Sequence, residues 1–137
     1  MAKKTYYFDM DGVLANFHKE PYKYTNAINR EWIANLEPFV ENVALINQMI
    51  AEHKTVYILS KCASEEAKLG KIDWLKKYVP ALDEKHIIII VRNGKKIDYI
   101  KTKTAVMIDD DMKNIKPFIE KGFDYYFVEN KGDKIIL

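Results

Sequence analysis

A chain of 137 residues, 48% hydrophobic and 31% charged, has the composition of one globular domain with an ordinary core. Its formal net charge is only +2 and its lysines are scattered among acids, which argues against a nucleic-acid-binding surface. Cys62 is the only cysteine, so an intramolecular disulfide is excluded, and no apolar run is long enough for a signal peptide or a membrane span. We therefore expect a cytoplasmic protein that binds neither nucleic acid polymers nor membranes.

Strand patterns alternate with helical patterns along the chain. Apolar runs rich in β-branched or aromatic residues predict strands at 5–8, 55–59, 86–91, 105–108 and 125–128. Helical spacing predicts helices over 41–52, 64–78 and 112–121, with Ser64 as an N-cap and Gly122 just beyond the last helix. Repeated strand–helix units predict an α/β fold, a doubly wound, Rossmann-like parallel sheet of about five strands.

Residues 1–137 are expected to form a single domain, and one stretch falls outside its rhythm. Residues 18–35 lie between the first predicted strand and the crossover helix predicted at 41–52, and they match neither pattern. We expect this stretch to be a short helical insert.

Two carboxylates follow the first predicted strand, in the sequence Asp9-Met10-Asp11-Gly12. Residues two apart on an extended chain project to the same side, so Asp9 and Asp11 can converge on one object. Ligands bind at the carboxyl ends of strands in open α/β sheets, and a set of oxygen ligands favours Mg²⁺ over zinc or copper. A plain turn would not need apolar residues on both sides, and an EF-hand loop has its glycine at position 6, whereas Gly12 falls at position 4.

The ends of the other predicted strands carry further polar groups. A hydroxyl follows the second strand, a lysine pair precedes the fourth, and three acids follow the fourth; these are Ser60, Lys95-Lys96 and Asp109-Asp110-Asp111. In a parallel sheet the strand ends meet at one edge, so these groups would gather there. A metal and a lysine would offset the charge of a phosphate, and a hydroxyl would hold its oxygens.

The order of these motifs resembles that of the haloacid dehalogenase-like phosphohydrolases, over nearly the whole chain. More narrowly, the chain is similar to the 5′(3′)-deoxyribonucleotidase group, cytosolic type C, in segments 9–17, 36–39, 71–75 and 106–110. The resemblance implies a phosphomonoesterase that uses Mg²⁺ and an aspartyl-phosphate intermediate, with a nucleoside 5′-monophosphate as its leading substrate.

The resemblance also implies roles for single residues. Asp9 would be the nucleophile, and Asp11 would protonate the leaving alkoxide and then activate water. Mg²⁺ would be held by Asp9, by the backbone carbonyl of Asp11 and by Asp110, with Asp109 close behind. The phosphate would be bound by the hydroxyl of Ser60 and the motif lysine Lys96, with Lys71 nearby as a second cation; Lys95 could exchange roles with Lys96.

The sequence says less about how the part of the substrate beyond the phosphate is recognised. The insert at 18–35 is shorter than the helical cap of nucleotidases, so we expect a more open pocket. Phe17 could stack on a nucleobase, as its position in the family implies, and Trp32 is a second candidate, although either could instead be a core residue. Another small phosphate ester stays open as the substrate, and a homo-oligomer is compatible with the sequence.

Two other classes of protein share parts of this pattern. A phosphoreceiver domain also combines acids, a hydroxyl, a lysine and Mg²⁺, but its acid pair follows the first strand and its phosphoacceptor the third, and it has no counterpart of Asp11. A catalytically silent phosphate-binding module would lack a core group, and none is missing here. Cys62 lacks the Cys-x₅-Arg loop of thiol phosphatases, and the histidines, of which only His18 lies near the site in sequence, are expected to be structural or exposed.

Overall fold

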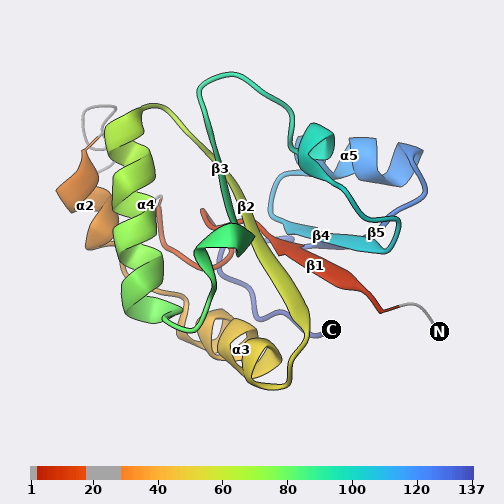
Figure 1. Cartoon of the computed structure of the whole chain (residues 1–137), viewed down its shortest axis with the longest axis horizontal. Coiled ribbons are helices and arrows are strands. Elements are labelled where there is room, and N and C mark those ends of the chain that lie inside the picture. Colours follow the sequence, from red (N-terminus) through yellow and green to blue (C-terminus); the bar gives the residue numbers. More distant parts are fainter. Residues whose placement is uncertain (1–2, 18–28) are drawn as a thin grey trace.

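The computed structural model describes residues 3–17 and 29–137. Its centre is a five-stranded parallel sheet with the strand order β3-β2-β1-β4-β5 (Figure 1). The strands are β1 (Thr5–Phe8), β2 (Thr55–Cys62), β3 (Ile87–Val91), β4 (Ala105–Asp109) and β5 (Asp124–Phe127). The predicted doubly wound, Rossmann-like sheet is therefore confirmed, and its order differs from the 2-1-3-4-5 order of phosphoreceiver domains.

Helices cover both faces of this sheet. They are α2 (Arg30–Ala34), α3 (Val40–Ala51), α4 (Glu65–Tyr78) and α5 (Met112–Glu120), with the 3₁₀ helices η1 (Glu84–His86) and η2 (Lys96–Tyr99). Neighbouring strand residues face opposite sides: Phe8 packs in a core with Trp74 of α4, and Tyr7 packs in a second core with Phe118 of α5. Because both faces are buried, all five residues of β4 are buried, as expected for a central parallel strand.

Local signals set most helix ends where the sequence predicts them. The Ser64 hydroxyl accepts a hydrogen bond from the Ala67 amide (3.1 Å) at the start of α4. Gly122 has a φ of 78° just after α5, a conformation that favours glycine.

Strand ends differ more from the prediction. β2 continues for three residues beyond 59, because Ser60, Lys61 and Cys62 go on pairing with β3. His86 belongs to η1, where its Nδ1 lies 2.8 Å from the carbonyl oxygen of Val56, and β5 lies one residue earlier than predicted.

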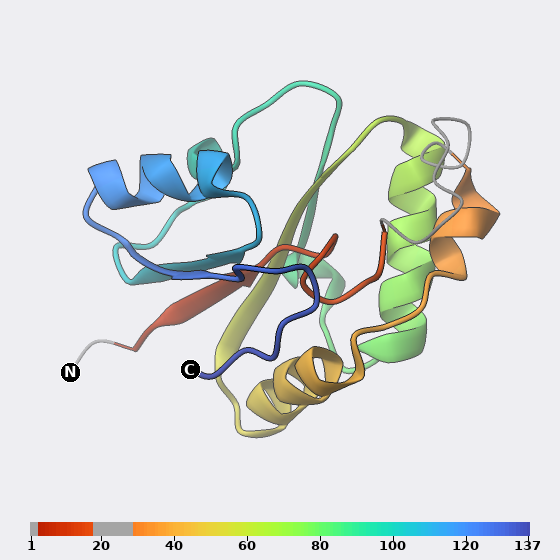
Figure 2. The same cartoon turned by 180° about the vertical axis from the view of Figure 1, so that it is seen from behind.

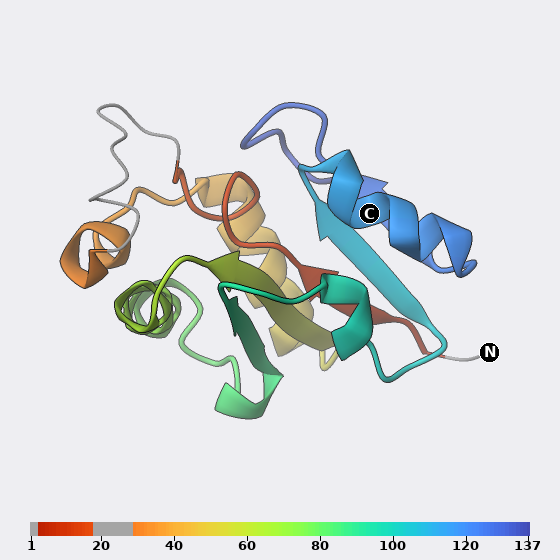
Figure 3. The ribbon, with the colours of Figure 1, turned by 90° about the horizontal axis from the view of Figure 1, so that it is seen from above.

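The described part of the predicted insert contains helix α2, which packs against α4 (Figure 3). Gly70 on α4 permits this contact, because a Cβ there would come within 2.6 Å of the Arg30 carbonyl oxygen. Arg30 also makes a bidentate ion pair with Asp73 of α4, with N···O distances of 2.7 and 3.1 Å. Residues 18–28 of the insert lie outside the described residues.

The C-terminal segment, residues 128–137, returns across the loop that follows β1 (Figure 2). The Gly132 amide donates to the carbonyl oxygen of Gly12 (2.8 Å). The buried Asn42 side chain donates to the carbonyl oxygens of Val13 (2.9 Å) and Asp133 (2.8 Å). The two segments are thereby fixed to each other. Across residues 3–17 and 29–137, no helix is both long and apolar enough to span a bilayer.

Candidate active site

A polar pocket of about 350 Å³ opens at the carboxyl ends of β1 and β4. The chain leaves β1 toward β2 on one side and later reaches β4 on the other, so this is the point at which strand order reverses and where α/β folds bind ligands. The pocket is lined by Asp9, Asp11, Lys61, Lys96, Asp110 and Lys131, with the first residues of α5 at its edge.

Lys96 joins two carboxylates in the interior of this site. Its Nζ donates to Asp9 Oδ1 and to Asp109 Oδ2, both at 2.9 Å, and its side chain is buried. Burial opposes the charged form of Lys96, but the two carboxylates outweigh that effect and raise its pKa. Lys95 precedes η2 on the exposed surface, so the geometry favours Lys96 over Lys95 as the site lysine.

Asp109 is fully buried, and its environment favours the protonated form. Burial is the main cause, and the neighbouring Asp9 charge adds to it, while Lys96 acts in the opposite direction; the net effect raises the pKa of Asp109 to about 8. The Asp111 amide donates to Asp109 Oδ1 (3.0 Å) and holds the carboxylate in place.

Three carboxylates lie close enough together to hold one cation. Asp9, Asp109 and Asp110 each offer an oxygen, and these oxygens lie within 4.8 Å of one another. Gly12 makes room for this cluster, because a Cβ at position 12 would overlap the Asp110 carboxylate. A donor set made only of oxygen atoms matches Mg²⁺.

Asp11 has one oxygen that is held and one that is not. Lys71 Nζ donates to Asp11 Oδ2 (2.7 Å), whereas Oδ1 is buried and has no hydrogen-bond partner among the described residues. Burial raises the pKa of Asp11. Lys71 lowers this pKa, and the negative charge of Asp9 raises it further, and the net effect is a raised pKa. An acid that keeps its proton to higher pH, with one oxygen unpaired, is suited to exchanging protons with a ligand.

Lys71 is buried and its ammonium is fully used within the protein. Besides Asp11, it donates to Ser60 Oγ (2.7 Å) and to the carbonyl oxygen of Lys61 (3.0 Å). An ammonium has three N–H groups, so Lys71 could bind a phosphate only by giving up one of these partners. Ser60 accepts this bond and its own hydroxyl hydrogen is still available to donate.

The two aromatic residues predicted to contact a substrate pack on each other. The Phe17 and Trp32 rings meet edge to face, with centroids 5.6 Å apart and an interplanar angle of 81°. Both are partly buried against the main core, and Lys71 Nζ lies 5.8 Å from the centroid of Phe17. Neither lines the described part of the polar pocket, so their stacking on a nucleobase stays a prediction.

The site also contains residues that sequence reasoning missed. Lys131 comes from the C-terminal segment and Asn114 from α5, and both line the pocket. No local motif marks them, because they reach the site only through the tertiary fold. Lys61, near the end of β2, lines the pocket as well.

The remaining titratable candidates lie apart from the pocket or are unsuited to catalysis. Burial raises the pKa of the Cys62 thiol, which donates to the Ser64 carbonyl oxygen (3.4 Å), so the thiolate that a nucleophile needs is disfavoured. His53 is exposed and follows α3, and His86 contacts Val56; neither lines the pocket. His18 lies outside the described residues.

Comparison with known proteins gives a family and a fold. Residues 19–131 match the family described as "5' nucleotidase, deoxy (Pyrimidine), cytosolic type C protein". A structure of the class C acid phosphatase from Bacillus anthracis superposes with a TM-score of 0.61 and 13% identity, covering 93% of this chain and 67% of that one. A second structure of that phosphatase, with tungstate bound, gives 0.59 and 15%, covering 94% and 68%. Such low identities establish only a shared fold, and comparison with curated protein sequences gave no match.

Proposed function

Because this chain belongs to the cytosolic type C 5′-nucleotidase family and is a phosphatase with a haloacid dehalogenase-like fold, we propose that it hydrolyses nucleoside 5′-monophosphates. One observation carries the mechanism: Lys96 ties Asp9 to Asp109 at the strand ends, with the unpaired oxygen of Asp11 in the same site. This constellation supplies a nucleophile, a charge that offsets phosphate and a proton donor.

In the first proposed step Asp9 is the nucleophile. One of its carboxylate oxygens bonds to phosphorus while the ester P–O bond breaks, which gives an aspartyl-phosphate. Asp11, whose pKa burial raises, gives a proton to the departing alkoxide oxygen. Lys96 has used two of its three N–H groups, so the third can bind a phosphate oxygen.

In the second proposed step Asp11, now a carboxylate, takes a proton from a water molecule. The water oxygen bonds to phosphorus, the bond between phosphorus and Asp9 breaks, and inorganic phosphate leaves. Lys71 is a positioning residue in both steps, since it fixes Asp11 Oδ2 and the Ser60 hydroxyl. The Ser60 hydroxyl can donate to a phosphate oxygen.

A magnesium ion fits the acidic cluster on the evidence of its donor atoms. Asp9, Asp110 and the backbone carbonyl of Asp11 would hold it, with Asp109 close behind. Bound there, Mg²⁺ would offset the negative charge that phosphate brings to four nearby carboxylates.

Asp110→Asn is expected to weaken Mg²⁺ binding by about tenfold or more, because it removes a charged oxygen from the cluster. Asp111→Asn is a matched control: Asp111 is exposed and caps α5 by accepting from the Lys113 amide, a role that asparagine also fills. Calorimetric titration with Mg²⁺ measures both. An equal loss in the two variants would contradict the assignment of Asp110.

The nucleotide preference rests on Phe17. Stacking on a base is worth roughly 1–3 kcal/mol, so Phe17→Ala should raise KM for a nucleoside monophosphate about fivefold or more while leaving KM for a simple aryl phosphate nearly unchanged. KM for both substrates is also measured in Trp32→Ala, because the Trp32 ring packs edge to face against Phe17. Equal changes for the two substrates would mean that Phe17 only packs in the core.

A phosphatase screen tests the proposed function as a whole. It compares nucleoside monophosphates, sugar phosphates and cofactor phosphates, each with and without Mg²⁺. We expect Mg²⁺-dependent release of phosphate with nucleoside monophosphates preferred. A clear preference for sugar phosphates would overturn the nucleotidase assignment and leave the chemistry in place, whereas no turnover on any substrate would overturn both.

A further inference from the structure

Lys131 forms an ion pair with a member of the acidic cluster. Its Nζ lies 2.8 Å from Asp110 Oδ2. The Asp110 side chain is only 7% exposed, whereas that of Lys131 is 50% exposed. A long side chain with half its surface in solvent can move away from Asp110 without opening the core.

The backbone that carries Lys131 is held firmly at the site. Asn130 and Asp133 close a tight turn, in which the Asp133 amide donates to the Asn130 carbonyl oxygen (2.9 Å). Gly132 sits in this turn with a φ of 79°, and its amide donates to the Gly12 carbonyl oxygen (2.8 Å) in the loop that carries the two catalytic aspartates. Lys131 therefore starts from a fixed point beside the pocket, and only its side chain is free to change partner.

A cation bound at the cluster competes with Lys131 for Asp110. A lysine ammonium and a divalent cation on the same carboxylate repel each other at close range. Lys96 is buried between Asp9 and Asp109 and stays in place, whereas the half-exposed Lys131 can withdraw from Asp110 into the pocket that it lines with Lys61 and Lys96.

The charges around the pocket indicate what Lys131 would bind next. Four carboxyl groups line it, from Asp9, Asp11, Asp110 and Asp111, together with three lysines. With Asp11 carrying the proton that it gives to the leaving group, three carboxylates balance three lysines, and a divalent cation leaves two positive charges in excess. That excess attracts a phosphate dianion.

We propose that Lys131 exchanges partners during binding: its ammonium neutralises Asp110 when the cluster holds no metal, and moves to the substrate phosphate when a divalent cation binds. This inference rests on the proposed function for the identity of the anion. It makes Lys131 both a competitor of the metal and a substrate-binding residue, contributed by a segment far from every motif in the sequence.

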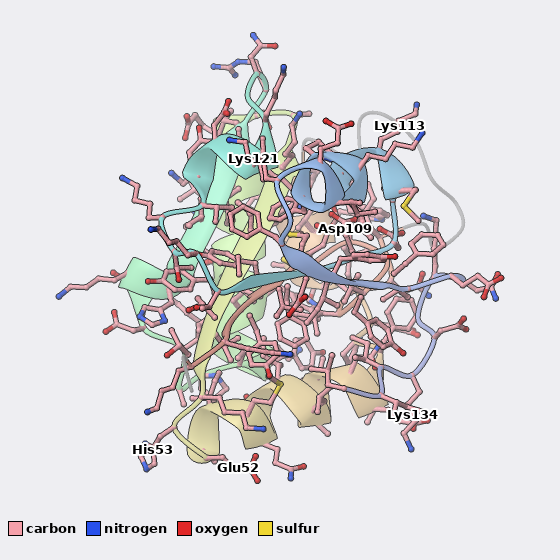
Figure 4. The ribbon with its side chains drawn as sticks, turned by 90° about the vertical axis from the view of Figure 1, so that its right-hand side faces the viewer. Glu52, His53, Asp109, Lys113, Lys121 and Lys134 are labelled. Atoms are coloured by element: carbon pink, nitrogen blue, oxygen red, sulfur yellow. The ribbon has the colours of Figure 1, made fainter. Side chains whose placement is uncertain are left out.

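The test uses Lys131→Gln, which removes the charge, and Lys131→Arg, which keeps it. Lys134→Gln is the matched control, because Lys134 is 67% exposed, pairs with Glu41 and lies on the outside of the same C-terminal segment, away from Asp109 (Figure 4). Calorimetry measures Mg²⁺ binding to each protein, and a second titration measures inorganic phosphate binding at saturating Mg²⁺.

Lys131→Gln is expected to bind Mg²⁺ about two- to fivefold more tightly than the wild type, the range set by a partly exposed ion pair, and to bind phosphate about two- to fivefold more weakly. Lys131→Arg and Lys134→Gln should resemble the wild type in both titrations. Unchanged or weaker Mg²⁺ binding in Lys131→Gln would overturn the exchange, as would tighter Mg²⁺ binding without any loss of phosphate affinity.

Failure of the proposed function would look different. The two titrations need no turnover, so a wild-type protein that hydrolyses no phosphate ester but still shows the opposite shifts in Lys131→Gln would contradict the enzymatic assignment and support the exchange. An active wild-type enzyme whose Lys131→Gln variant binds Mg²⁺ and phosphate as the wild type does would support the enzymatic assignment and contradict the exchange.

Discussion

Asp9→Asn is expected to reduce phosphate release by more than about 10³-fold and to abolish covalent phosphoenzyme formation. An amide oxygen is a poor nucleophile, and the change also removes a charge from the pair with Lys96 and from the metal cluster. Release of phosphate measures the first effect. Trapping with beryllofluoride, which mimics a phosphoryl group on an aspartate, measures the second.

The control for this variant is Asp98→Asn, which changes an exposed carboxyl on η2. It should keep wild-type turnover and trapping. Asp9→Asn leaves the buried Lys96 with fewer negative partners, which could destabilise the fold. Unfolding of both variants is therefore followed by circular dichroism, to show that the loss of turnover and trapping does not come from a loss of folded protein. Wild-type rates in Asp9→Asn would exclude an aspartyl-phosphate on this residue.

The fold was predictable because its signals are local and repeated. Apolar runs without polar interruption identified all five strands, and the Ser64 and Gly122 signals marked helix ends that the structure contains. The predicted resemblance to a nucleotidase family is confirmed by the family match. Strand ends were less accurate, since β2 extends to Cys62 only because β3 offers a partner there, and that pairing cannot be read from β2 alone.

The proximity of the candidate site residues was predictable only where a motif and a strand end coincide. Asp9, Asp11 and Asp109 follow or end strands, so parallel pairing brings them together. The choice between Lys95 and Lys96 needed the 3₁₀ turn of η2, which buries one lysine and exposes the other. Sequence does place Lys71 near the site, yet only the structure shows that its three N–H groups are already occupied.

Lys131 shows why the remainder could not be predicted. Its position depends on a turn that is anchored to the Gly12 carbonyl oxygen and on Asn42, which joins that turn to the loop after β1. Each of these bonds links residues far apart in the sequence, and none has a local composition signal. The pKa shift of Asp11 is equally non-local, since burial by several elements is its main cause.

Asp11→Asn is expected to lower turnover by about 10²–10⁴-fold, the usual contribution of general acid–base catalysis. Unlike Asp9→Asn, it should still form the phosphoenzyme, because asparagine can keep the hydrogen bond from Lys71 to its side-chain oxygen and leaves Asp9 and the metal cluster unchanged.

The choice of substrate separates the two roles of Asp11. An aryl phosphate with a weakly basic leaving group needs little protonation in the first step, so Asp11→Asn should form phosphoenzyme from it readily and then stall, because no base activates water in the second step. Rapid-quench kinetics should show a burst of one aryl alcohol per active site followed by slow turnover, with the phosphorylated protein visible by mass spectrometry. With a nucleoside monophosphate the first step also needs the acid, so the burst should disappear. A variant that loses the burst with both substrates would show that Asp11 is needed to form the phosphoenzyme itself. That result would contradict the assignment of Asp9 as nucleophile and Asp11 as acid and base alone.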